Sequence, residues 1–169
     1  VDWGKVNQPM EPDKFELLLS DVRNYLNDRN DLFVQDLYCG ANPKYRLSVR
    51  YVSPSAWHMA FVRNMFIRPD LADLAGWNPN FTVLHAPEFE ATPSKHGTRT
   101  GTVIALNLAK RMIIIGGTRY AGELKKAMFT VMNYYLPKQG ILSMHCSANY
   151  APSKDGGKDD TALFFGLSG

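Results

Sequence analysis

A short apolar run followed at once by two glycines and an amphipathic segment is the feature that most restricts how this chain can fold. Met112 to Ile115 are all apolar, and Gly116-Gly117 end the run abruptly. From about Ala121 to Tyr135, apolar side chains then recur at helical spacing. Strand, glycine turn and helix in this order expose side chains and backbone N–H groups where the helix begins, which makes the turn a candidate binding site.

The rest of the pattern predicts a mixed α/β domain, with a mixed β-sheet and flanking helices. Apolar residues at helical spacing predict three helices, at residues 11 to about 27–30, 54 to about 65, and 121–135. Apolar runs and alternation predict strands at residues 32–39, 45–52, 81–86, 102–108, 112–115, 140–146 and 161–165. Leu136-Pro137 should stop the last helix, and residues 87–101 should form a surface loop or a long hairpin end.

Composition limits the class of protein. The chain has 169 residues, 45% of them hydrophobic and 21% charged, which suits one folded domain, and no linker is long enough to divide it. No apolar stretch approaches the roughly 18 to 20 residues of a membrane span, and the start does not resemble a signal peptide. The net charge of +3 is too small to indicate nucleic-acid binding. Cys39 and Cys146 fit a reducing compartment, so we expect a cytoplasmic protein that binds neither membranes nor nucleic acid.

The turn carries an aromatic hydroxyl, Tyr120, and the helix after it carries two adjacent lysines, Lys125 and Lys126. A lysine pair on a helix is normally solvent-facing. Two neighbouring ammonium groups also repel each other, which favours the neutral amine on one of them. A neutral lysine nitrogen has a lone pair and can bind a metal ion, although lysine is a rare ligand.

A second candidate segment, made of small and polar residues from Ser143 to Asn149, contains His145. A lone histidine is more often a structural residue than a metal ligand. Cys146 beside it gives only a slight indication of a zinc or thiol site, because no second pair is present. The other histidines, His58, His85 and His96, have no partners at metal-ligand spacing.

A third candidate segment lies at the end of the sequence, where Gly166, Leu167, Ser168 and Gly169 follow a predicted hydrophobic strand. A strand followed by a glycine-rich turn is how a phosphate loop, G-x-x-x-x-G-K-[ST], begins. The alternative is an ordinary turn or a flexible tail. Ser168 lacks the G-x-S-x-G frame of a hydrolase nucleophile.

Taken together, these three segments resemble the corresponding segments of the ATP-dependent phosphoenolpyruvate carboxykinases. The resemblance is carried by residues 116–137, 143–149 and 164–169, and upstream by residues 34–43, 46–50 and 63–69. It spans nearly the whole chain, and it is to the ATP-using class rather than the GTP-using one. It implies a carboxy-lyase that converts oxaloacetate and ATP to phosphoenolpyruvate, CO2 and ADP, the committed step into gluconeogenesis.

The resemblance also implies roles for individual residues. Tyr120 would contact the substrate or CO2. Lys126 would be a neutral ligand of the catalytic Mn2+ (or Mg2+), close to substrate and nucleotide phosphate, and His145 would be a second ligand. Lys125 would raise the local positive potential and help to keep Lys126 neutral. Gly166 to Gly169, through Leu167 and Ser168, would open the loop that binds ATP.

In that family, residues 1–169 would be the N-terminal domain plus the first strand of the nucleotide-binding domain, from about residue 140. A substrate-binding arginine in a Gly-Arg-Ser-Pro motif, the phosphate-loop lysine and a metal-binding aspartate are absent, so we expect an inactive fragment whose partner is the remaining part of the same enzyme. The segment 150–160 is longer than the family's Asn-Val-Gly turn. Two alternatives stay open: a module that holds an anion at the Gly116 turn without turnover, and a generic phosphate-loop nucleotidase.

Overall fold

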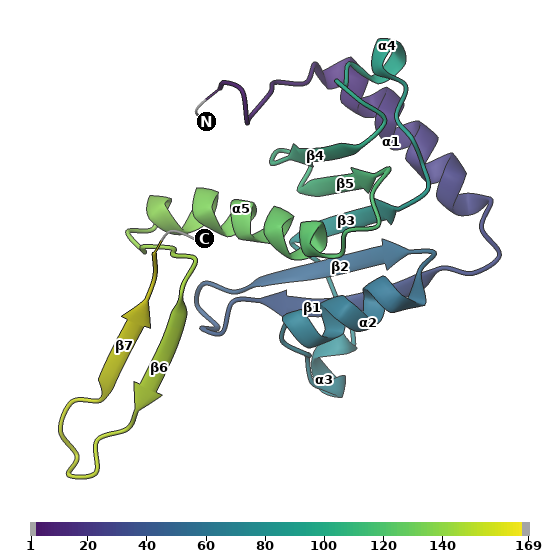
Figure 1. The fold of residues 1–169 in the computed structure, drawn as a ribbon. Helices are drawn as coiled ribbons and strands as arrows, with labels where there is room; N and C mark the ends of the chain where they lie inside the picture. The colour runs from purple at the N-terminus through teal and green to yellow at the C-terminus, as the bar shows by residue number, and fades with distance from the viewer. Residues whose placement is uncertain (1–2, 167–169) are drawn as a thin grey trace. The chain divides into compact units, whose positions relative to one another are not determined.

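The computed structural model describes residues 3–166. In chain order, the elements are α1 (Pro12–Asn27), β1 (Phe33–Cys39), β2 (Leu47–Ser53), α2 (Ala56–Met65), α3 (Leu71–Leu74), β3 (Phe81–Ala86), α4 (Pro93–His96), β4 (Val103–Asn107), β5 (Met112–Gly116), α5 (Gly122–Lys138), β6 (Ser147–Ala151) and β7 (Asp160–Phe164) (Figure 1). Internal contacts divide the chain into two compact units, Val1–Val131 and Met132–Gly169. The division falls inside α5, and each unit is described by itself.

A five-stranded sheet in the order β1-β2-β3-β5-β4 forms the centre of the first unit. The three central strands, β2, β3 and β5, are parallel, and the edge strands β1 and β4 each run antiparallel to their neighbour. This mixed sheet with flanking helices confirms the predicted fold class. Because the central strands are parallel, their carboxyl ends, near Ser53, Ala86 and Gly116, lie at one edge of the sheet, where open α/β sheets commonly bind ligands.

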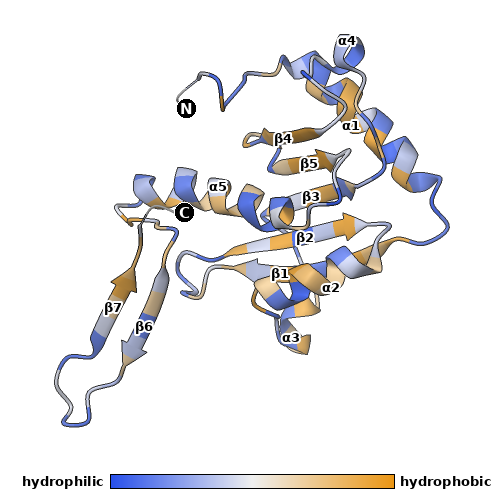
Figure 2. Ribbon diagram, in the orientation of Figure 1, coloured by the Kyte–Doolittle hydropathy of each residue, from blue (hydrophilic) through white to orange (hydrophobic). Residues whose placement is uncertain are grey.

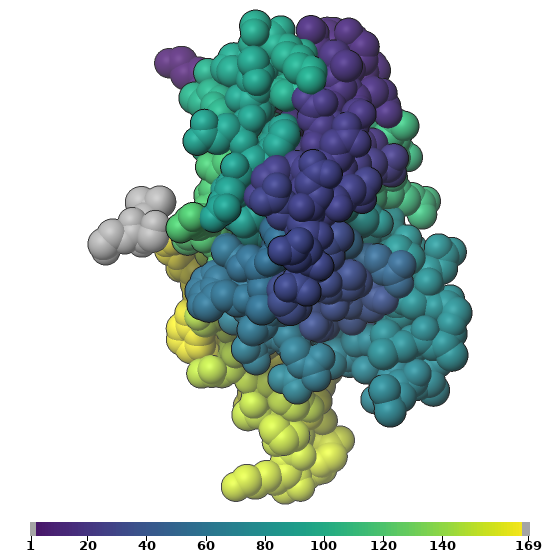
Figure 3. Space-filling view, turned by 90° about the vertical axis from the view of Figure 1, so that its right-hand side faces the viewer, coloured from purple at the N-terminus to yellow at the C-terminus, as the bar shows by residue number. Residues whose placement is uncertain are grey.

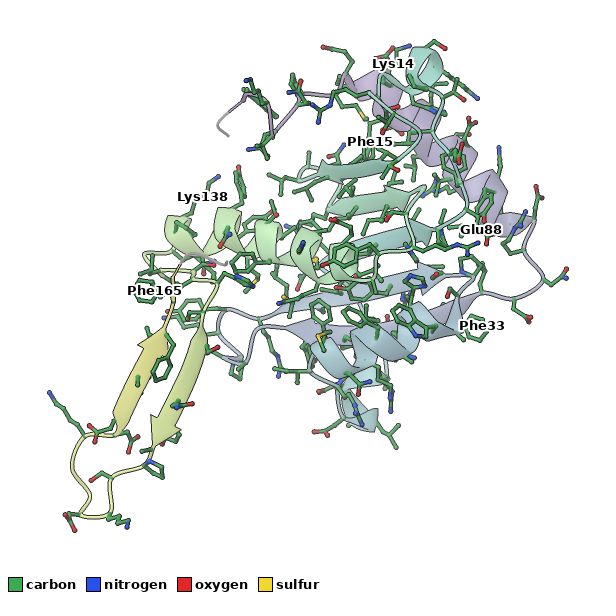
Figure 4. All side chains as sticks on the ribbon, in the orientation of Figure 1. Lys14, Phe15, Phe33, Glu88, Lys138 and Phe165 are labelled. Atoms are coloured by element: carbon green, nitrogen blue, oxygen red, sulfur yellow. The ribbon has the colours of Figure 1, made fainter. Side chains whose placement is uncertain are left out.

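Helix α1 covers one face of this sheet. Its apolar stripe packs with Leu84 of β3 and Ile114 of β5 in one buried cluster. The buried residues of the stripe are Phe15, Leu18, Leu19, Val22 and Leu26. Figure 4 shows Phe15 turned toward the sheet and Lys14 turned toward α4, and Figure 2 shows the matching apolar colour of β4 and β5. The period of this stripe is what makes residues 12–27 an amphipathic helix.

The opposite face of the sheet is covered by α2 and by the start of α5. The hydroxyl of Tyr51, a fully buried residue of β2, donates to the backbone carbonyl of Leu124 at 3.4 Å. The buried residues are His58, Met59 and Val62 of α2, and, in the part of α5 that belongs to the first unit, Leu124, Ala127, Met128 and Val131. The inward positions predicted for Leu124, Met128 and Val131 are therefore confirmed, and Tyr135, the fourth, is half-buried.

Two predictions in the first 140 residues were wrong. Pro137 does not stop α5, which ends at Lys138. Proline removes a hydrogen-bond donor and crowds the preceding turn, and the helix continues for only one residue beyond it. Residues 87–101 are not simply a surface loop, because they contain α4 and the buried residues Ala91 and His96. The Nε2 atom of His96 lies 3.0 Å from a carboxylate oxygen of Asp21 on α1, and Figure 3 shows the purple surface of α1 against the green-teal surface of this segment.

The second unit is mainly a two-stranded hairpin. β6 and β7 pair antiparallel, from Ser147 opposite Phe164 to Ala151 opposite Asp160. The predicted last strand is confirmed to within a residue, but the strand predicted at 140–146 is wrong. Residues 141–146 are irregular, because the pairing that makes a strand begins only at Ser147. Both strands are exposed along their whole length, including Leu163 and Phe164.

Within residues 3–166, no helix has both the length and the apolar character needed to cross a membrane.

Candidate functional site

The turn after β5 lies at the carboxyl edge of the sheet, and its shape depends on Gly117. This residue has φ +66°, in the left-handed region that favours glycine, and its N–H lies 3.3 Å from the carbonyl of Ala86. Its own carbonyl accepts a bond of 2.8 Å from the Thr102 hydroxyl. A Cβ atom at position 117 would lie 2.6 Å from the Gly101 carbonyl oxygen. The turn therefore requires glycine for both its backbone angles and its close approach to residue 101.

Tyr120 and Lys126 come together at the end of this turn. The Tyr120 N–H donates to the Thr118 hydroxyl at 3.1 Å, and 56% of the residue is exposed. The Lys126 Nζ atom lies 4.9 Å from the centre of the Tyr120 ring, a cation–π arrangement. Lys125 and Lys126 are both exposed, as expected for neighbours on the first turns of α5. A phenol and an amine are therefore exposed side by side at the end of the turn.

Gly122, the first residue of α5, leaves the space that the Tyr120 ring occupies. A Cβ at position 122 would lie 2.5 Å from Cζ and 2.6 Å from the hydroxyl oxygen of Tyr120. Since the ring is exposed, an added methyl group should displace the ring and leave the fold intact.

On the substrate contact that the family resemblance implies for Tyr120, we expect Gly122→Ala in a full-length enzyme to lower kcat/KM roughly tenfold, because displacing such a group is costly to a reaction that depends on position. The melting temperature should not fall, since alanine is the better helix former. Steady-state kinetics and thermal unfolding check both parts. In a Tyr120→Ala background the same substitution should have no further effect on kcat/KM; a second full loss there would show that Gly122 acts through something other than Tyr120.

Two buried histidines lie directly behind the turn. His58 of α2 and His85 of β3 have their ring centres 4.4 Å apart. The His58 Nε2 atom is 3.0 Å from the Arg119 carbonyl, and the His85 Nε2 atom is 3.4 Å from the Thr118 carbonyl. Sequence reasoning noted both histidines but gave them no role. The signal that could have found His85 is a titratable residue inside an otherwise apolar strand.

The predicted residues of the second unit are described separately. His145 is exposed and lies in the irregular segment before β6, and Gly166 is exposed just after β7. Leu167, Ser168 and Gly169 lie outside the described residues. Among residues 3–166 there is no group of three or more His, Cys, Asp and Glu side chains that could hold a metal ion.

Comparison with known protein families identifies the family of this chain. The model of the family described as phosphoenolpyruvate carboxykinase matches residues 1–169. The chain belongs to this family.

Individual carboxykinases agree with that assignment. The chain is 52% identical over 169 residues to the "Phosphoenolpyruvate carboxykinase (ATP)" of Geobacillus kaustophilus, and 51% identical over 167 residues to the protein of the same name from Paracoccus denitrificans. These alignments cover 100% and 99% of the chain, and 31% of each relative. The family resemblance predicted from the sequence is confirmed, and the chain spans about a third of the length of these relatives.

The pKa of His85 gives this carboxykinase chain a pH dependence. Burial, with a smaller contribution from the neighbouring His58, lowers the pKa of His85 from 6.5 to about 4. Between those values the unfolded chain binds more protons than the folded one, so folding should weaken as pH falls. We expect a loss of about 2.5 kcal/mol between pH 7 and pH 4.5 from this residue. Denaturant unfolding of the chain at both pH values measures it, with His85→Gln as the control that should lose less; equal losses in both chains would contradict the assignment.

Proposed function

We propose that this chain is the N-terminal part of an ATP-dependent phosphoenolpyruvate carboxykinase, an enzyme that converts oxaloacetate and ATP to phosphoenolpyruvate, CO2 and ADP. The observation that carries the proposal is the pairing of the Tyr120 phenol with the Lys126 amine at the glycine turn, in a chain of this family. The names of the relatives, each of which includes ATP, support the choice of nucleotide.

The reaction explains why an amine and a phenol would be needed here. In the first step the bond to the departing carboxylate breaks, CO2 leaves, and the electron pair becomes an enolate. The enolate oxygen then attacks the γ-phosphorus of ATP, and ADP leaves. Negative charge therefore develops first on one oxygen and then on the transferred phosphoryl group, and preorganised positive groups stabilise both.

Each exposed group of the turn can be given a task in that sequence. The Tyr120 hydroxyl would donate a hydrogen bond to a substrate carboxylate or to CO2, and so orient the bond that breaks. Lys125 would supply positive potential beside the nucleotide phosphates. Lys126 and His145 would be ligands of Mn2+ or Mg2+, and the chemistry that such an ion supplies when bound is stabilisation of charge on the enolate oxygen.

We also propose that the nucleotide-binding domain begins in the second unit, with Gly166, Leu167, Ser168 and Gly169 opening the loop that holds the ATP phosphates. A two-stranded hairpin is at best marginally stable alone, and β6 and β7 expose Leu163 and Phe164. This supports a larger sheet, supplied by the rest of the same enzyme. Cys39 and Cys146 are both free thiols, which supports a cytoplasmic location.

The proposal predicts that the 169-residue chain alone does not make phosphoenolpyruvate. The phosphate-loop lysine and the metal-binding aspartate of the family are not in this sequence, and each places charge against the transferred phosphoryl group. A coupled assay with oxaloacetate, ATP and Mn2+ checks this, with a full-length protein that contains the chain as the positive control. ATP-dependent turnover by the chain alone would contradict the prediction. A full-length protein that binds ATP or oxaloacetate but turns over neither would favour the non-catalytic module.

A further inference from the structure

Beneath the turn that presents Tyr120, two histidines contact consecutive carbonyl groups of the backbone. His58 lies in the first turn of α2 and His85 lies near the end of β3, so separate elements supply them. They approach the Arg119 and Thr118 carbonyls from the side of the sheet, at 3.0 Å and 3.4 Å. His85 is fully buried and His58 is 6% exposed, so water does not compete strongly for these bonds.

Both nitrogens of each ring have a partner within hydrogen-bond distance. A carbonyl oxygen only accepts hydrogen bonds, so each Nε2 atom must carry a hydrogen. Each Nδ1 atom lies within hydrogen-bond distance of a serine hydroxyl, that of Ser55 at 2.8 Å for His58 and that of Ser53 at 2.9 Å for His85. The Ser53 oxygen also accepts from the Ser55 N–H at 3.1 Å. Both nitrogens of each ring therefore have a hydrogen-bond partner, and the orientation of each ring is fixed from both ends.

We propose that His58 and His85 are positioning residues that hold the Thr118 and Arg119 carbonyls in place, and so fix the direction in which Tyr120 leaves the turn. The Tyr120 backbone follows directly after the second held carbonyl, and the Tyr120 carbonyl accepts the Glu123 N–H at 3.1 Å as α5 begins. A shift of the two carbonyls would therefore move both the phenol and the first turn of the helix that carries Lys126. The catalytic consequence rests on the proposed function; the tether itself does not.

The His58 contact is the shorter one and gives the sharper test. Leucine at position 58 fills a similar volume and removes both polar contacts. Glutamine can place its amide N–H near the position of Nε2 and keep the bond to Arg119. Asparagine places its amide nearer to Nδ1 and loses that bond. A positioning role therefore predicts that H58Q retains the properties of the wild type while H58L and H58N do not.

Two measurements on the full-length enzyme separate the tether from the catalytic role. Hydrogen exchange of the backbone amides in residues 117–123, read by mass spectrometry, should quicken about tenfold in H58L and H58N and stay near wild type in H58Q. The value of kcat/KM for oxaloacetate should fall about 10- to 100-fold in the first two and recover in the third.

His96 supplies the matched control, because it is also a buried histidine but lies in α4, away from the turn. It is 1% exposed, and it bonds the Thr92 N–H and the Asp21 carboxylate rather than the turn. H96L should lower the melting temperature while leaving exchange at 117–123 and kcat/KM near wild type.

The outcomes are distinct. Unchanged hydrogen exchange at residues 117–123 in H58L and H58N would overturn the proposal. So would a kcat/KM that falls in proportion to the melting temperature in every variant, including H96L. Faster exchange in an enzyme whose wild type has no carboxykinase activity would uphold the tether and overturn the proposed function. If H58L does not fold, the comparison of H58Q with H58N, which both keep a polar side chain, decides the question.

Discussion

Lys126→Arg in a full-length carboxykinase that contains this chain is expected to lower kcat by at least about 100-fold, whereas Lys125→Arg should cause a much smaller loss. Arginine keeps the positive charge, so a purely electrostatic role would survive the change. A metal ligand would not, because the guanidinium group stays protonated and offers no lone pair. Its bulk would also disturb the contact with the Tyr120 ring, which now lies 4.9 Å from the Lys126 nitrogen.

The adjacent lysine makes this a controlled comparison. Lys125 and Lys126 are both exposed on the first turns of α5, so the two substitutions disturb the helix to the same degree. Steady-state kinetics across Mn2+ concentrations should show a collapsed kcat and an altered Mn2+ dependence in the Lys126 variant only. If both variants keep comparable activity, Lys126 is a solvent-facing residue and does not belong to the site.

Gly117→Ala is expected to destabilise the chain by roughly 3 kcal/mol or more. The left-handed backbone angle, φ +66°, costs about 1 to 2 kcal/mol for any residue with a Cβ. The new Cβ would in addition lie 2.6 Å from the Gly101 carbonyl oxygen, and backbone on both sides must move to relieve the overlap. Because the turn places Tyr120, the same substitution should also remove activity from the full-length enzyme.

Gly76→Ala separates the cost of the backbone angle from the cost of the Cβ overlap. It has φ +77°, and a Cβ there would meet nothing within 4 Å, so Gly76→Ala carries the backbone cost without the overlap. Denaturant unfolding of the chain should show a loss of about 1 to 2 kcal/mol for Gly76→Ala and a clearly larger loss for Gly117→Ala. Equal losses at the two positions would mean that the turn adjusts freely and is not fixed by its contact with Gly101.

Local patterns were sufficient to predict most of the first unit. The strand Phe81–Ala86 was predicted with the correct bounds, because apolar and β-branched residues between turn signals specify a strand directly. The inward side of α5 followed from the spacing of Leu124, Met128 and Val131. The turn between β5 and α5 followed from its two glycines, one of which has a positive φ.

The features that the sequence did not reveal depend on partners far away in the chain. Helix α4, whose one buried residue is His96, is attached to α1 by Asp21, a residue 75 positions from His96. The strand wrongly predicted at 140–146 has a suitable local pattern, but within the described residues the pairing with β7 begins only at Ser147. His58 and His85 are separated from the carbonyls that they contact by 61 and 33 positions. Such contacts exist only once the sheet has formed, so spacing rules for metal or catalytic motifs could not find them.

The most direct test of the metal-ligand roles proposed for Lys126 and His145 is pulsed electron paramagnetic resonance of Mn2+ bound to the full-length enzyme. With lysine labelled by nitrogen-15, the spectrum should show coupling of the Mn2+ spin to one lysine nitrogen and one histidine nitrogen. The lysine coupling should vanish in Lys126→Arg and persist in Lys125→Arg. A spectrum without lysine coupling, or one that Lys126→Arg leaves unchanged, would contradict these roles.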